Sequence, residues 1–238
     1  MKRTIIETED GSKTLYIEGL DETYHSKHGA VQEAKHVFIK HGFQFFENKQ
    51  FKSLKILEIG LGSGLNAFLT LLEAERSLTK INYIGVEKYP VSIEEFAALD
   101  YFESIFKLYP EFAERKTEFE IYFQNLFQAE WENEVEISAH FKIKKIKKDF
   151  FDLTTKDGEN FDLVYFDAFG SKVQPELWEE DLLSIVASLT NDTSIVSTYA
   201  AKGTFKRALK SLGFVVKKFP GPPGKREMMV AFKNFDYE

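Results

Sequence analysis

One glycine-rich segment constrains the fold of this 238-residue chain more than any other part of the sequence. Residues 56–59 read Ile-Leu-Glu-Ile, and three glycines follow at alternate positions, Gly60, Gly62 and Gly64. Apolar residues of this kind suit a parallel strand that is covered on both faces, while glycine permits positive φ angles and a close approach of the backbone to a ligand. The segment therefore predicts a buried strand that passes through a tight turn into a helix, with bare backbone at a ligand site.

The spacing of these glycines favours one class of ligand. A dinucleotide site needs the pattern G-x-G-x-x-G with a helix N-terminus aimed at a pyrophosphate, whereas here G-x-G-x-G follows an acid, Glu58. A carboxylate at that place would repel a pyrophosphate, but it can accept hydrogen bonds, directly or through water, from a cationic amino group. We therefore expect S-adenosylmethionine rather than NAD. A glycine-rich turn without any ligand is the alternative.

The composition limits the chemistry that the chain can perform. It contains no cysteine, which excludes a thiolate nucleophile, a disulfide and a cysteine-bound zinc ion. Because the covalent route by which many enzymes methylate pyrimidine carbons uses a cysteine, an acceptor here must bring its own nucleophile. The five histidines show no spacing typical of a metal site, so we expect no metal.

Size, hydropathy and charge indicate one main soluble domain. With 43% hydrophobic residues the chain can bury a single large core. It has no apolar run of ~18 residues, and its start lacks the apolar core of a signal peptide, so we expect a cytoplasmic protein without a membrane partner. The net charge of −7 argues against a large non-specific nucleic-acid surface but leaves room for local basic patches.

Strand-like and helix-like segments alternate along most of the chain. We expect strands at 55–59, 81–87, 162–167 and 194–198, and helices at 66–77, 91–98, 175–189 and 201–211. This alternation predicts an α/β, doubly wound, mostly parallel sheet, the Rossmann-like fold of class I S-adenosylmethionine-dependent methyltransferases. Two further strands, at 214–217 and 227–232 around a Pro/Gly loop, would give the sheet an antiparallel last strand.

The ends of this sheet carry additional segments within what we expect to be a single domain. Residues 1–50 would form an N-terminal hairpin around Asp10-Gly11 and an amphipathic helix from Ala30 to His41, packed on the domain of residues 51–238. Residues 100–134 are rich in aromatic side chains at helical spacing and predict a helical insert, with a base-stacking surface as the alternative. The lysine-rich run 141–149 predicts a strand with lysines at an exposed face or edge, or else an RNA contact.

Acidic residues follow several of the expected strands. Glu87 ends the strand 83–87, where an acid commonly accepts hydrogen bonds from both ribose hydroxyls of an adenosyl group. Asp149 could accept the adenine amine while Phe150 stacks on the ring, although Asp149 could equally cap a helix. Glu87 lies about 25 residues after the glycine turn, near the ~20 of the nucleotide-binding pattern, so the two features support each other.

Asp167 is placed to act on an acceptor group. It ends an apolar strand and precedes Ala-Phe-Gly, so its carboxylate would lie at the carboxyl edge of the sheet, beside the expected methyl group. An alkylamine is mostly protonated at neutral pH and must lose a proton before it attacks, and Asp167 could orient the amine and take that proton. Asp-Ala-Phe-Gly differs from the (Asp/Asn)-Pro-Pro-aromatic pattern of enzymes that methylate aromatic amines of bases, so an aliphatic amine fits better. As an alternative, Asp167 caps the next element.

Two cations follow on a stiff loop near the end of the sequence. Lys225 and Arg226 come directly after Pro-Gly-Pro-Pro-Gly and just before the last expected strand. Fixed cations at the mouth of a site suit phosphate or carboxylate groups. An ordinary basic turn is the alternative.

Several short motifs occur together along the chain, and as a set they resemble one family. The motifs are Tyr24-His25, Glu33-Ala-Lys-His-Val-Phe38, Glu58-Ile-Gly-Leu-Gly-Ser-Gly-Leu-Asn66, Val86-Glu-Lys-Tyr-Pro90, Phe166-Asp-Ala-Phe169, Pro175-Glu-Leu-Trp178, Ser197-Thr-Tyr199 and Gly224-Lys-Arg-Glu-Met228. They resemble the methyltransferase half of the bifunctional tRNA 5-methylaminomethyl-2-thiouridine biosynthesis protein. The resemblance extends over nearly the whole chain.

The resemblance implies a reaction and a set of site residues. The reaction is transfer of a methyl group from S-adenosylmethionine to the amine of 5-aminomethyl-2-thiouridine at the tRNA wobble position, which agrees with the aliphatic amine inferred above. The expected cofactor residues are Glu58, Gly60, Gly62, Gly64, Asn66, Glu87, Lys88, Asp149 and Asp167. Asp167 and Lys225 are expected to be catalytic, and the substrate is expected to contact Tyr24, Glu33, Phe169, Lys225 and Arg226.

Two departures from the family leave alternatives open. Larger members continue into a flavin-dependent oxidase, whereas this chain ends at Glu238, so we expect a separate enzyme to supply the aminomethyl substrate.

The loop before Lys225 is Pro-Gly-Pro-Pro-Gly rather than glycine-rich with an added basic residue. This difference leaves the tRNA contact undefined beyond a local patch of Lys202, Lys206, Arg207, Lys210, Lys225 and Arg226. The competing functions are an aminopropyltransferase or small-molecule amine methyltransferase on the same fold, and a non-enzymatic adenosyl-binding scaffold.

Overall fold

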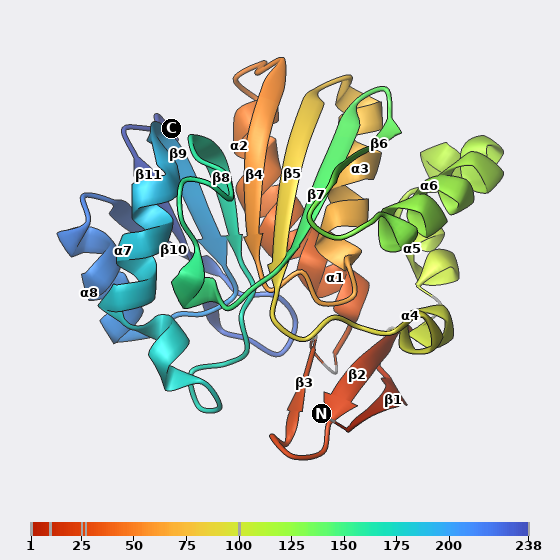
Figure 1. Cartoon of the computed structure of the whole chain (residues 1–238), viewed down its shortest axis with the longest axis horizontal. Coiled ribbons are helices and arrows are strands. Elements are labelled where there is room, and N and C mark those ends of the chain that lie inside the picture. Colours follow the sequence, from red (N-terminus) through yellow and green to blue (C-terminus); the bar gives the residue numbers. More distant parts are fainter. Residues whose placement is uncertain (1, 10, 25, 27, 100, 238) are drawn as a thin grey trace.

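The computed structural model describes residues 2–9, 11–24, 26, 28–99 and 101–237. Asp10 of the expected hairpin turn, His25 of the first family motif and position 100 of the expected insert lie outside the described residues. The described residues form an α/β fold around one large sheet (Figure 1). Within these ranges no helix combines the length and the apolar character that a membrane span requires.

The large sheet has eight strands and is mostly parallel. In spatial order they are β10 (Val215–Pro220), β11 (Glu227–Lys233), β9 (Thr190–Thr198), β8 (Phe161–Phe166), β4 (Ser53–Ile59), β5 (Lys80–Glu87), β7 (Phe141–Lys147) and β6 (Glu134–Ser138). The five strands from β9 to β7 are parallel, while β11 pairs antiparallel with β9 and β10 pairs antiparallel with β11. The predicted fold class and its antiparallel last strand are therefore confirmed.

Helices cover both faces of this sheet (Figure 1). One face packs against α1 (Ala30–Ala34), a π-helix (Lys35–Phe43), α2 (Gln44–Glu47) and α3 (Leu65–Ser77). The other face packs against α7 (Glu180–Leu189), α8 (Gly203–Ser211) and the short 3₁₀ helices Phe150–Asp152 and Pro175–Trp178. The helix expected from Ala30 to His41 thus continues to Glu47 and is π-helical in its middle.

Alternation along the strands decides which side chains face α3. Successive side chains of a strand point to opposite faces, so residues two apart share a face. Ile56 of β4, Tyr83 of β5 and Tyr165 of β8 belong to the core on the α3 side, whereas Leu57 and Val164 belong to the core under α7 and α8. The acids that follow in the same register, at positions 58, 87 and 167, therefore lie toward the α3 side of the sheet.

A small antiparallel sheet stands at the carboxyl end of the parallel strands. It comprises β1 (Arg3–Glu7), β2 (Lys13–Ile17) and the two-residue strand β3 (Glu22–Thr23), so it has one strand more than the expected hairpin. The Arg3 side chain is only 7% exposed and donates to the backbone carbonyls of Tyr89 and Pro90 and to Glu95. These contacts fix the small sheet against the loop that follows β5.

The aromatic segment forms the expected helical insert. It follows directly after α4 (Ile93–Leu99) and contains α5 (Phe102–Leu108), a 3₁₀ helix (Pro110–Arg115) and α6 (Lys116–Gln128). Many of its aromatic side chains are buried in the core on the α3 side. The lysine-rich run forms the expected strand, β7, but this strand does not lie at an edge, because β6 pairs with it and forms the edge instead. Lys145 of this strand is buried, and its ammonium donates to the carbonyl of Phe127.

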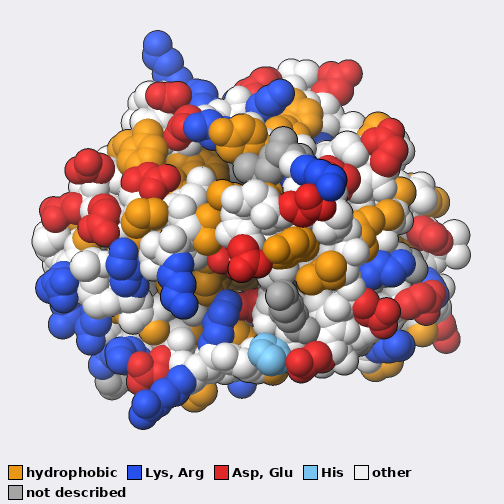
Figure 2. Space-filling model, turned by 90° about the horizontal axis from the view of Figure 1, so that it is seen from below, with side chains coloured by type: hydrophobic (Ala, Val, Ile, Leu, Met, Phe, Trp, Pro, Cys, Tyr) orange, Lys and Arg blue, Asp and Glu red, His pale blue; other side chains and the backbone are white. Residues whose placement is uncertain are grey.

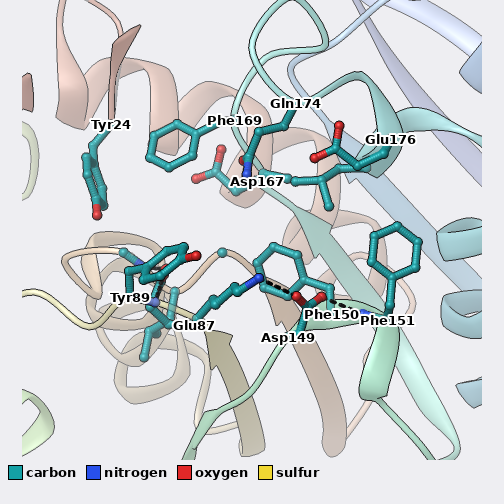
Figure 3. A pocket seen from close by; sticks show the side chains of 16 residues that line it. Tyr24, Glu87, Tyr89, Asp149, Phe150, Phe151, Asp167, Phe169, Gln174 and Glu176 are labelled. Carbon is teal, nitrogen blue, oxygen red and sulfur yellow. Dashed lines mark hydrogen bonds and ion pairs between the residues drawn. The ribbon is translucent and has the colours of Figure 1, made fainter. Parts of the chain in front are cut away.

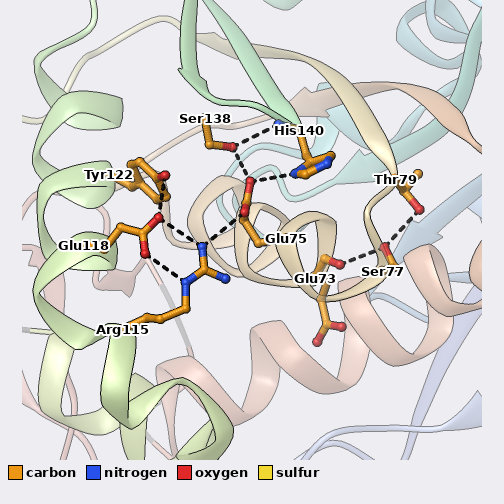
Figure 4. A network of polar contacts seen from close by, with 9 residues as sticks. All are labelled: Glu73, Glu75, Ser77, Thr79, Arg115, Glu118, Tyr122, Ser138 and His140. Atoms are coloured by element: carbon orange, nitrogen blue, oxygen red, sulfur yellow. Dashed lines mark hydrogen bonds and ion pairs between the residues drawn. The ribbon is translucent and has the colours of Figure 1, made fainter.

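A polar network joins the insert to α3 and to the β6–β7 edge (Figure 4). The buried Glu75 carboxylate of α3 accepts hydrogen bonds from Ser138 Oγ at 2.6 Å, His140 Nδ1 at 3.0 Å and Arg115 Nη2 at 3.3 Å. Burial works to raise the pKa of Glu75, but these hydrogen bonds outweigh it and hold the pKa below its usual range. Three separate segments therefore depend on one ionised side chain.

We predict that Glu75→Gln weakens this attachment. The amide loses the charge-assisted bonds, so the free energy of unfolding should fall by about 1–3 kcal/mol at neutral pH. Because the folded pKa is depressed, the stabilisation by Glu75 is complete above its unfolded pKa and disappears as the pH falls through the folded value, so the two proteins should converge once the pH is below the folded pKa. Urea unfolding across this range measures the difference. Glu134→Gln, at an exposed edge position near Lys142, is the control and should change stability by less than about 0.5 kcal/mol; equal losses would contradict the prediction.

Candidate active site

The carboxyl ends of β4, β5 and β8 meet at the glycine-rich turn. The backbone N–H groups of Gly60 and Leu61 both donate to the carbonyl of Val86 at 3.0 Å, and the N–H of Asp167 donates to the carbonyl of Ile59 at 2.9 Å. These bonds hold the turn against the neighbouring strands on both sides. Side chains that are separated by more than a hundred residues in the sequence are thereby brought to one edge of the sheet.

Left-handed backbone angles favour glycine at all three glycine positions of this turn, and two of them approach distant segments closely. Gly60 has φ +92° and Gly62 has φ +52°, both in the left-handed region that other residues avoid. A Cβ atom on Gly60 would lie 2.5 Å from the carbonyl oxygen of Asp167, and one on Gly62 would lie 3.1 Å from the Tyr24 ring. The third glycine, Gly64, serves a different purpose, because it precedes α3 and faces Leu126 of the insert.

A pocket opens beside this turn, and we call it the turn pocket (Figure 3). It has a volume of about 770 Å³ including its mouth. Tyr24 and Phe169 lie on one side of it, and Glu87, Tyr89 and Asp149 lie on the other. Its lining also contains Gly60, Leu61, Gly62, Lys88, Phe150, Phe151, Asp167, Ala168, Gln174, Glu176 and Leu177.

A second pocket adjoins the first, and we call it the lysine pocket after Lys172, Lys202 and Lys225 in its lining. It has a volume of about 1120 Å³ including its mouth. Four residues line both pockets: Tyr24, Asp167, Ala168 and Phe169. Asp167 is therefore the carboxyl on the wall that the two pockets share.

Glu87 lies in the turn pocket with both oxygens oriented by the backbone. Oε2 accepts from the N–H of Gly62 at 3.1 Å, and Oε1 accepts from the N–H of Tyr89 at 2.8 Å. Burial raises the pKa of Glu87, and these backbone bonds together with the charge of Arg3 counteract the rise. The carboxyl is thus fixed between the glycine turn and the loop after β5, where it remains accessible from the pocket.

Asp149 occupies the turn pocket while it also caps a helix, so both of the expected roles are compatible with its position. Oδ1 accepts from the N–H of Phe151 at 3.1 Å at the start of the short 3₁₀ helix, and Oδ2 pairs with Lys88 at 2.5 Å. The hydrogen bond from Lys88 lowers the pKa of Asp149. Phe150 and Phe151 provide aromatic faces beside it.

Within the described residues, one side-chain hydrogen bond holds Asp167. Its Oδ2 accepts a hydrogen bond of 2.8 Å from Asn66 Nδ2. Burial and the nearby charge of Glu33 raise the pKa of Asp167 to about 7, against the lowering effects of Asn66 and Lys225. A carboxyl with this pKa exchanges its proton near neutral pH, as a group that accepts a proton from an amine must do.

Glu58 lies outside the lining of the turn pocket. Its side chain is fully buried, and its two oxygens accept from Asn66 Nδ2 at 2.8 Å and from the Tyr83 hydroxyl at 2.8 Å. Asn66 is likewise buried and absent from the lining, as is Gly64. Of the nine expected cofactor residues, the structure thus brings six into the turn pocket and places Glu58, Gly64 and Asn66 behind it.

The lysine pocket contains most of the expected substrate residues. The Lys225 ammonium pairs with Glu33 and lies 3.7 Å from the centroid of the Tyr199 ring. Glu33 also accepts a hydrogen bond of 2.7 Å from the N–H of Ser26. Arg226 is exposed and lines neither pocket.

Hydrogen bonds from the buried Trp178 and the half-buried Tyr199 hold the loop after β8. The Tyr199 hydroxyl donates to the carbonyl of Ala168 at 2.8 Å, and Trp178 Nε1 donates to the carbonyl of Phe169 at 2.7 Å. Phe169 then meets Tyr24 edge-on, with their ring centroids 5.1 Å apart. The wall between the two pockets is therefore fixed from both the small sheet and the large one.

Sequence reasoning missed several residues of the turn pocket, namely Tyr89, Phe151, Gln174, Glu176 and Leu177. Tyr89 belongs to one of the family motifs and could have been found from its place directly after Glu87 and Lys88. Glu176 and Leu177 belong to the family motif Pro175-Glu-Leu-Trp178, whereas Phe151 and Gln174 belong to none of the motifs. Only the folded chain brings them to the pocket.

The residues of the turn pocket fit the expected cofactor. At Gly60 and Gly62 an added Cβ would meet protein atoms, so bare backbone borders the pocket there. An acid, Glu87, stands at the strand end where ribose hydroxyls need an acceptor, and aromatic faces and Asp149 are available for the adenine ring. The shared wall then places Asp167 where the pocket adjoins the space for an acceptor.

Comparisons with known proteins agree with this geometry. A family model described as S-adenosyl-L-methionine-dependent methyltransferase matches residues 112–234. The chain is 28% identical over 226 residues to the tRNA 5-methylaminomethyl-2-thiouridine biosynthesis bifunctional protein MnmC of Leptospira borgpetersenii serovar Hardjo-bovis (strain JB197), a match that covers 92% of this chain and 33% of that protein. The chain thus spans about a third of the length of the curated relatives that it matches.

Solved structures share the fold over almost the whole chain. The crystal structure of MNMC2 from Aquifex aeolicus has a TM-score of 0.74 and 23% identity, and the match covers 99% of this chain and 72% of that one. Spermidine synthase from Thermotoga maritima has a TM-score of 0.55 and 12% identity, with coverage of 99% and 70%. At these identities the likeness establishes the fold.

We predict that Gly60→Ala disrupts the site more than the same substitution does at a glycine that has a similar φ angle but no close neighbour. The added Cβ has a left-handed φ and also clashes with the carbonyl of Asp167, so β4 and β8 must separate. Gly213→Ala is the matched control, because Gly213 has φ +89° and no atom within 4 Å of a Cβ. We expect the control to lose about 1–2 kcal/mol of unfolding free energy and Gly60→Ala to lose more, with weakened adenosyl-ligand binding as well. Thermal unfolding and calorimetric titration measure both; equal effects of the two substitutions would contradict the prediction.

We predict that Asp167→Asn stabilises the protein at alkaline pH. Because the folded pKa of Asp167 is raised to about 7, the native state retains a proton that the unfolded state releases, and stability falls as the pH rises from about 4 to about 7. The neutral amide avoids this loss, so the variant should exceed the wild type by up to about 4 kcal/mol above pH ~7 and match it below pH ~4. Urea unfolding at several pH values tests this.

The control for this measurement is Asp162→Asn in the same strand. Asp162 accepts hydrogen bonds from the N–H of Lys55 and from Asn191, so its replacement should bring no gain at any pH. An Asp167→Asn protein less stable than the wild type at alkaline pH would refute the prediction.

Proposed function

This chain belongs to the S-adenosyl-L-methionine-dependent methyltransferase family, and from that premise we propose that it methylates the aminomethyl group of 5-aminomethyl-2-thiouridine at the wobble position of tRNA. The product would be 5-methylaminomethyl-2-thiouridine. The observation that carries the proposal is the position of Asp167 on the wall between the turn pocket and the lysine pocket. The name of the Leptospira relative supports the same substrate.

We assign the turn pocket to the methyl donor. Glu87 would accept from the ribose hydroxyls, Asp149 from the adenine amine, and Gly60 and Gly62 would border the donor with bare backbone. Lys88 would hold Asp149 in place through their ion pair. When bound, S-adenosylmethionine supplies a methyl group on a positively charged sulfur, toward which an uncharged amine is nucleophilic.

We assign the lysine pocket to the acceptor nucleotide. An aminomethyl group arrives mostly as a cation, and the carboxyls of Asp167 and Glu33 suit such a cation. Asp167 would take the proton that frees the amine lone pair, while Lys225, paired with Glu33, would stand beside the nucleotide. Tyr24 and Phe169 would enclose the reacting groups from the shared wall and exclude water.

Charge on the surface supports a nucleic-acid substrate. Figure 2 shows Lys and Arg side chains gathered on the left side of the face seen from below, the side on which Figure 1 places α8 and β10. Of the candidate patch from the sequence, Lys206, Arg207 and Lys210 lie on α8, Lys202 and Lys225 line the lysine pocket, and the exposed Arg226 follows Lys225 in the chain. Such a patch can bind phosphates although the net charge of the chain is −7.

Two further parts of the proposal follow from its substrate. Methyl transfer consumes an aminomethyl group and does not create one, so a separate enzyme would supply it. A tRNA-modifying enzyme would act in the cytoplasm, where its substrate is found. Both remain proposals that rest on the reaction.

The test is a methyl-transfer assay with labelled S-adenosylmethionine. The substrates are tRNA carrying 5-aminomethyluridine with and without the 2-thio group, unmodified tRNA, and polyamines. We expect label only in the aminomethyl tRNAs, and a loss of about 10²–10⁴-fold in Asp167→Ala. Asp162→Asn, in the same strand but away from the pockets, should retain full activity.

The competing functions give different results in this assay. Label in a small amine alone would favour a small-molecule amine methyltransferase. Aminopropyl transfer to a polyamine from decarboxylated S-adenosylmethionine, with no methylation, would favour an aminopropyltransferase, whose fold this chain shares with spermidine synthase. Cofactor binding without any turnover would favour the adenosyl-binding scaffold. Each of these results would overturn the proposal.

A further inference from the structure

A line of buried hydrogen bonds runs from Asp167 away from the pockets. Asn66 Nδ2 donates to Asp167 Oδ2 at 2.8 Å and to Glu58 Oε1 at 2.8 Å, so one amide group connects two carboxyls. The Tyr83 hydroxyl donates to the other oxygen of Glu58 at 2.8 Å. Glu58 is 0% exposed and Asn66 is 2% exposed.

The orientation of Asn66 is determined by its neighbours. If the amide were rotated, its oxygen would face two carboxyl groups, and two acceptors would meet without a hydrogen between them unless both acids were protonated. The observed orientation leaves Asn66 Oδ1 buried without a hydrogen-bond partner in the described part of the chain. The cost of leaving Oδ1 without a hydrogen bond is thus offset by the two hydrogen bonds that Nδ2 donates to the acids.

The backbone at the start of α3 fixes the position of Asn66. Asn66 is the second residue of α3, directly after the turn that Gly64 ends in a left-handed conformation. The Thr70 hydroxyl donates to the backbone carbonyl of Asn66 at 2.7 Å, one helical turn further on. The Asn66 side chain therefore extends from a rigid helix start toward the ends of β4 and β8.

We propose that Asn66 is the positioning residue of Asp167, and that Glu58 is an anchor for Asn66 rather than a ligand of the cofactor. By holding Oδ2, Asn66 leaves Asp167 Oδ1 to the pockets. Glu58 in turn keeps the Asn66 amide from rotating. The kinetic part of this inference rests on the proposed function, whereas the arrangement of the two carboxyls does not.

The charges around Asp167 come from several elements. Glu33 of α1 and Glu58 of β4 bring negative or potentially negative groups, and Lys225 brings a positive one. The phenols of Tyr83, Tyr101 and Tyr199 also face Asp167 and have raised pKa values because they are buried. Burial, followed by the charge of Asp167, raises the pKa of Glu58 well above its usual range, against the lowering effect of the hydrogen bonds from Asn66 and Tyr83.

The first test measures the titration of Asp167 directly, without substrate. Carbon-detected NMR of ¹³C-labelled carboxyl groups follows the Asp167 signal, which is assigned by its absence in Asp167→Asn. We expect the midpoint to rise in Asn66→Ala, because this variant loses a hydrogen bond that lowers the pKa of Asp167. It should rise further in Asn66→Asp, which places a third acid between the other two. An unchanged midpoint in both variants would overturn the proposal.

Glu58 variants test the anchor separately. Glu58→Gln retains an acceptor for Asn66 and a partner for Tyr83, so the midpoint of Asp167 should not rise in this variant. A rise in Glu58→Gln equal to that in Glu58→Ala would overturn the anchor role. Glu58→Ala removes the anchor and should shift the midpoint as Asn66→Ala does, with Glu58→Gln as its conservative rescue.

Kinetics provide the second readout. In the methyl-transfer assay, Asn66→Ala should lower kcat by about tenfold to a hundredfold, the effect of one hydrogen bond to a charged group, and should move the acidic limb of the pH–rate profile upward. KM for S-adenosylmethionine should change little, because Asn66 does not line the turn pocket. A large rise of that KM with kcat unchanged would mean that Asn66 serves the cofactor, and would overturn the proposal.

A matched control separates positioning from stability. Ser197→Ala removes another fully buried hydrogen bond, the one that Ser197 donates to the carbonyl of Val37 at 2.8 Å, and should lower the melting temperature without moving the titration of Asp167. If the wild type methylates no aminomethyl tRNA, the proposed function fails while the NMR titrations still test Asn66. If the wild type is active but Asn66→Ala keeps its kcat and pH profile, this inference alone fails.

Discussion

The backbone of the glycine-rich turn passes so close to the end of β8 that no Cβ atom fits at Gly60. This close approach lets the N–H of Asp167 bond to the carbonyl of Ile59, while Gly60 and Leu61 bond to Val86 on the other side. The three central strand ends are thereby joined at one place. The two pockets, the shared wall and the line of buried hydrogen bonds all depend on this junction.

Much of the fold follows from local patterns in the sequence. The strands of the parallel sheet are apolar runs ended by glycine, acid or turn residues, and the alternation of strands and helices leaves few possible topologies. Glu87 and Asp167 could be located because each ends such a run, and the carboxyl ends of parallel strands share one edge. The place of each acid at the end of a strand was therefore enough to predict that it lies at the site.

Other features depend on contacts between distant segments, which no local pattern reveals. The strand β6 is a short Glu-Val-Glu-Ile-Ser segment that forms by pairing with β7. The direction of Glu58 depends on which face of β4 packs against α3, and that face turned out to lead to Asn66 and Tyr83 rather than to the turn pocket. The small sheet contributes Tyr24 to both pockets only because Arg3 attaches it to the loop after β5.

The shared wall has a thermodynamic consequence for ligand binding. A cation on either side of Asp167 favours its ionised form, so at neutral pH the first ligand to bind expels a proton into the solvent. The second ligand then finds the carboxylate already charged and bears less of that cost. If a cationic donor and a cationic acceptor bind as proposed, this single proton would couple their binding reciprocally, and the heat of each association would depend on the ionisation enthalpy of the buffer.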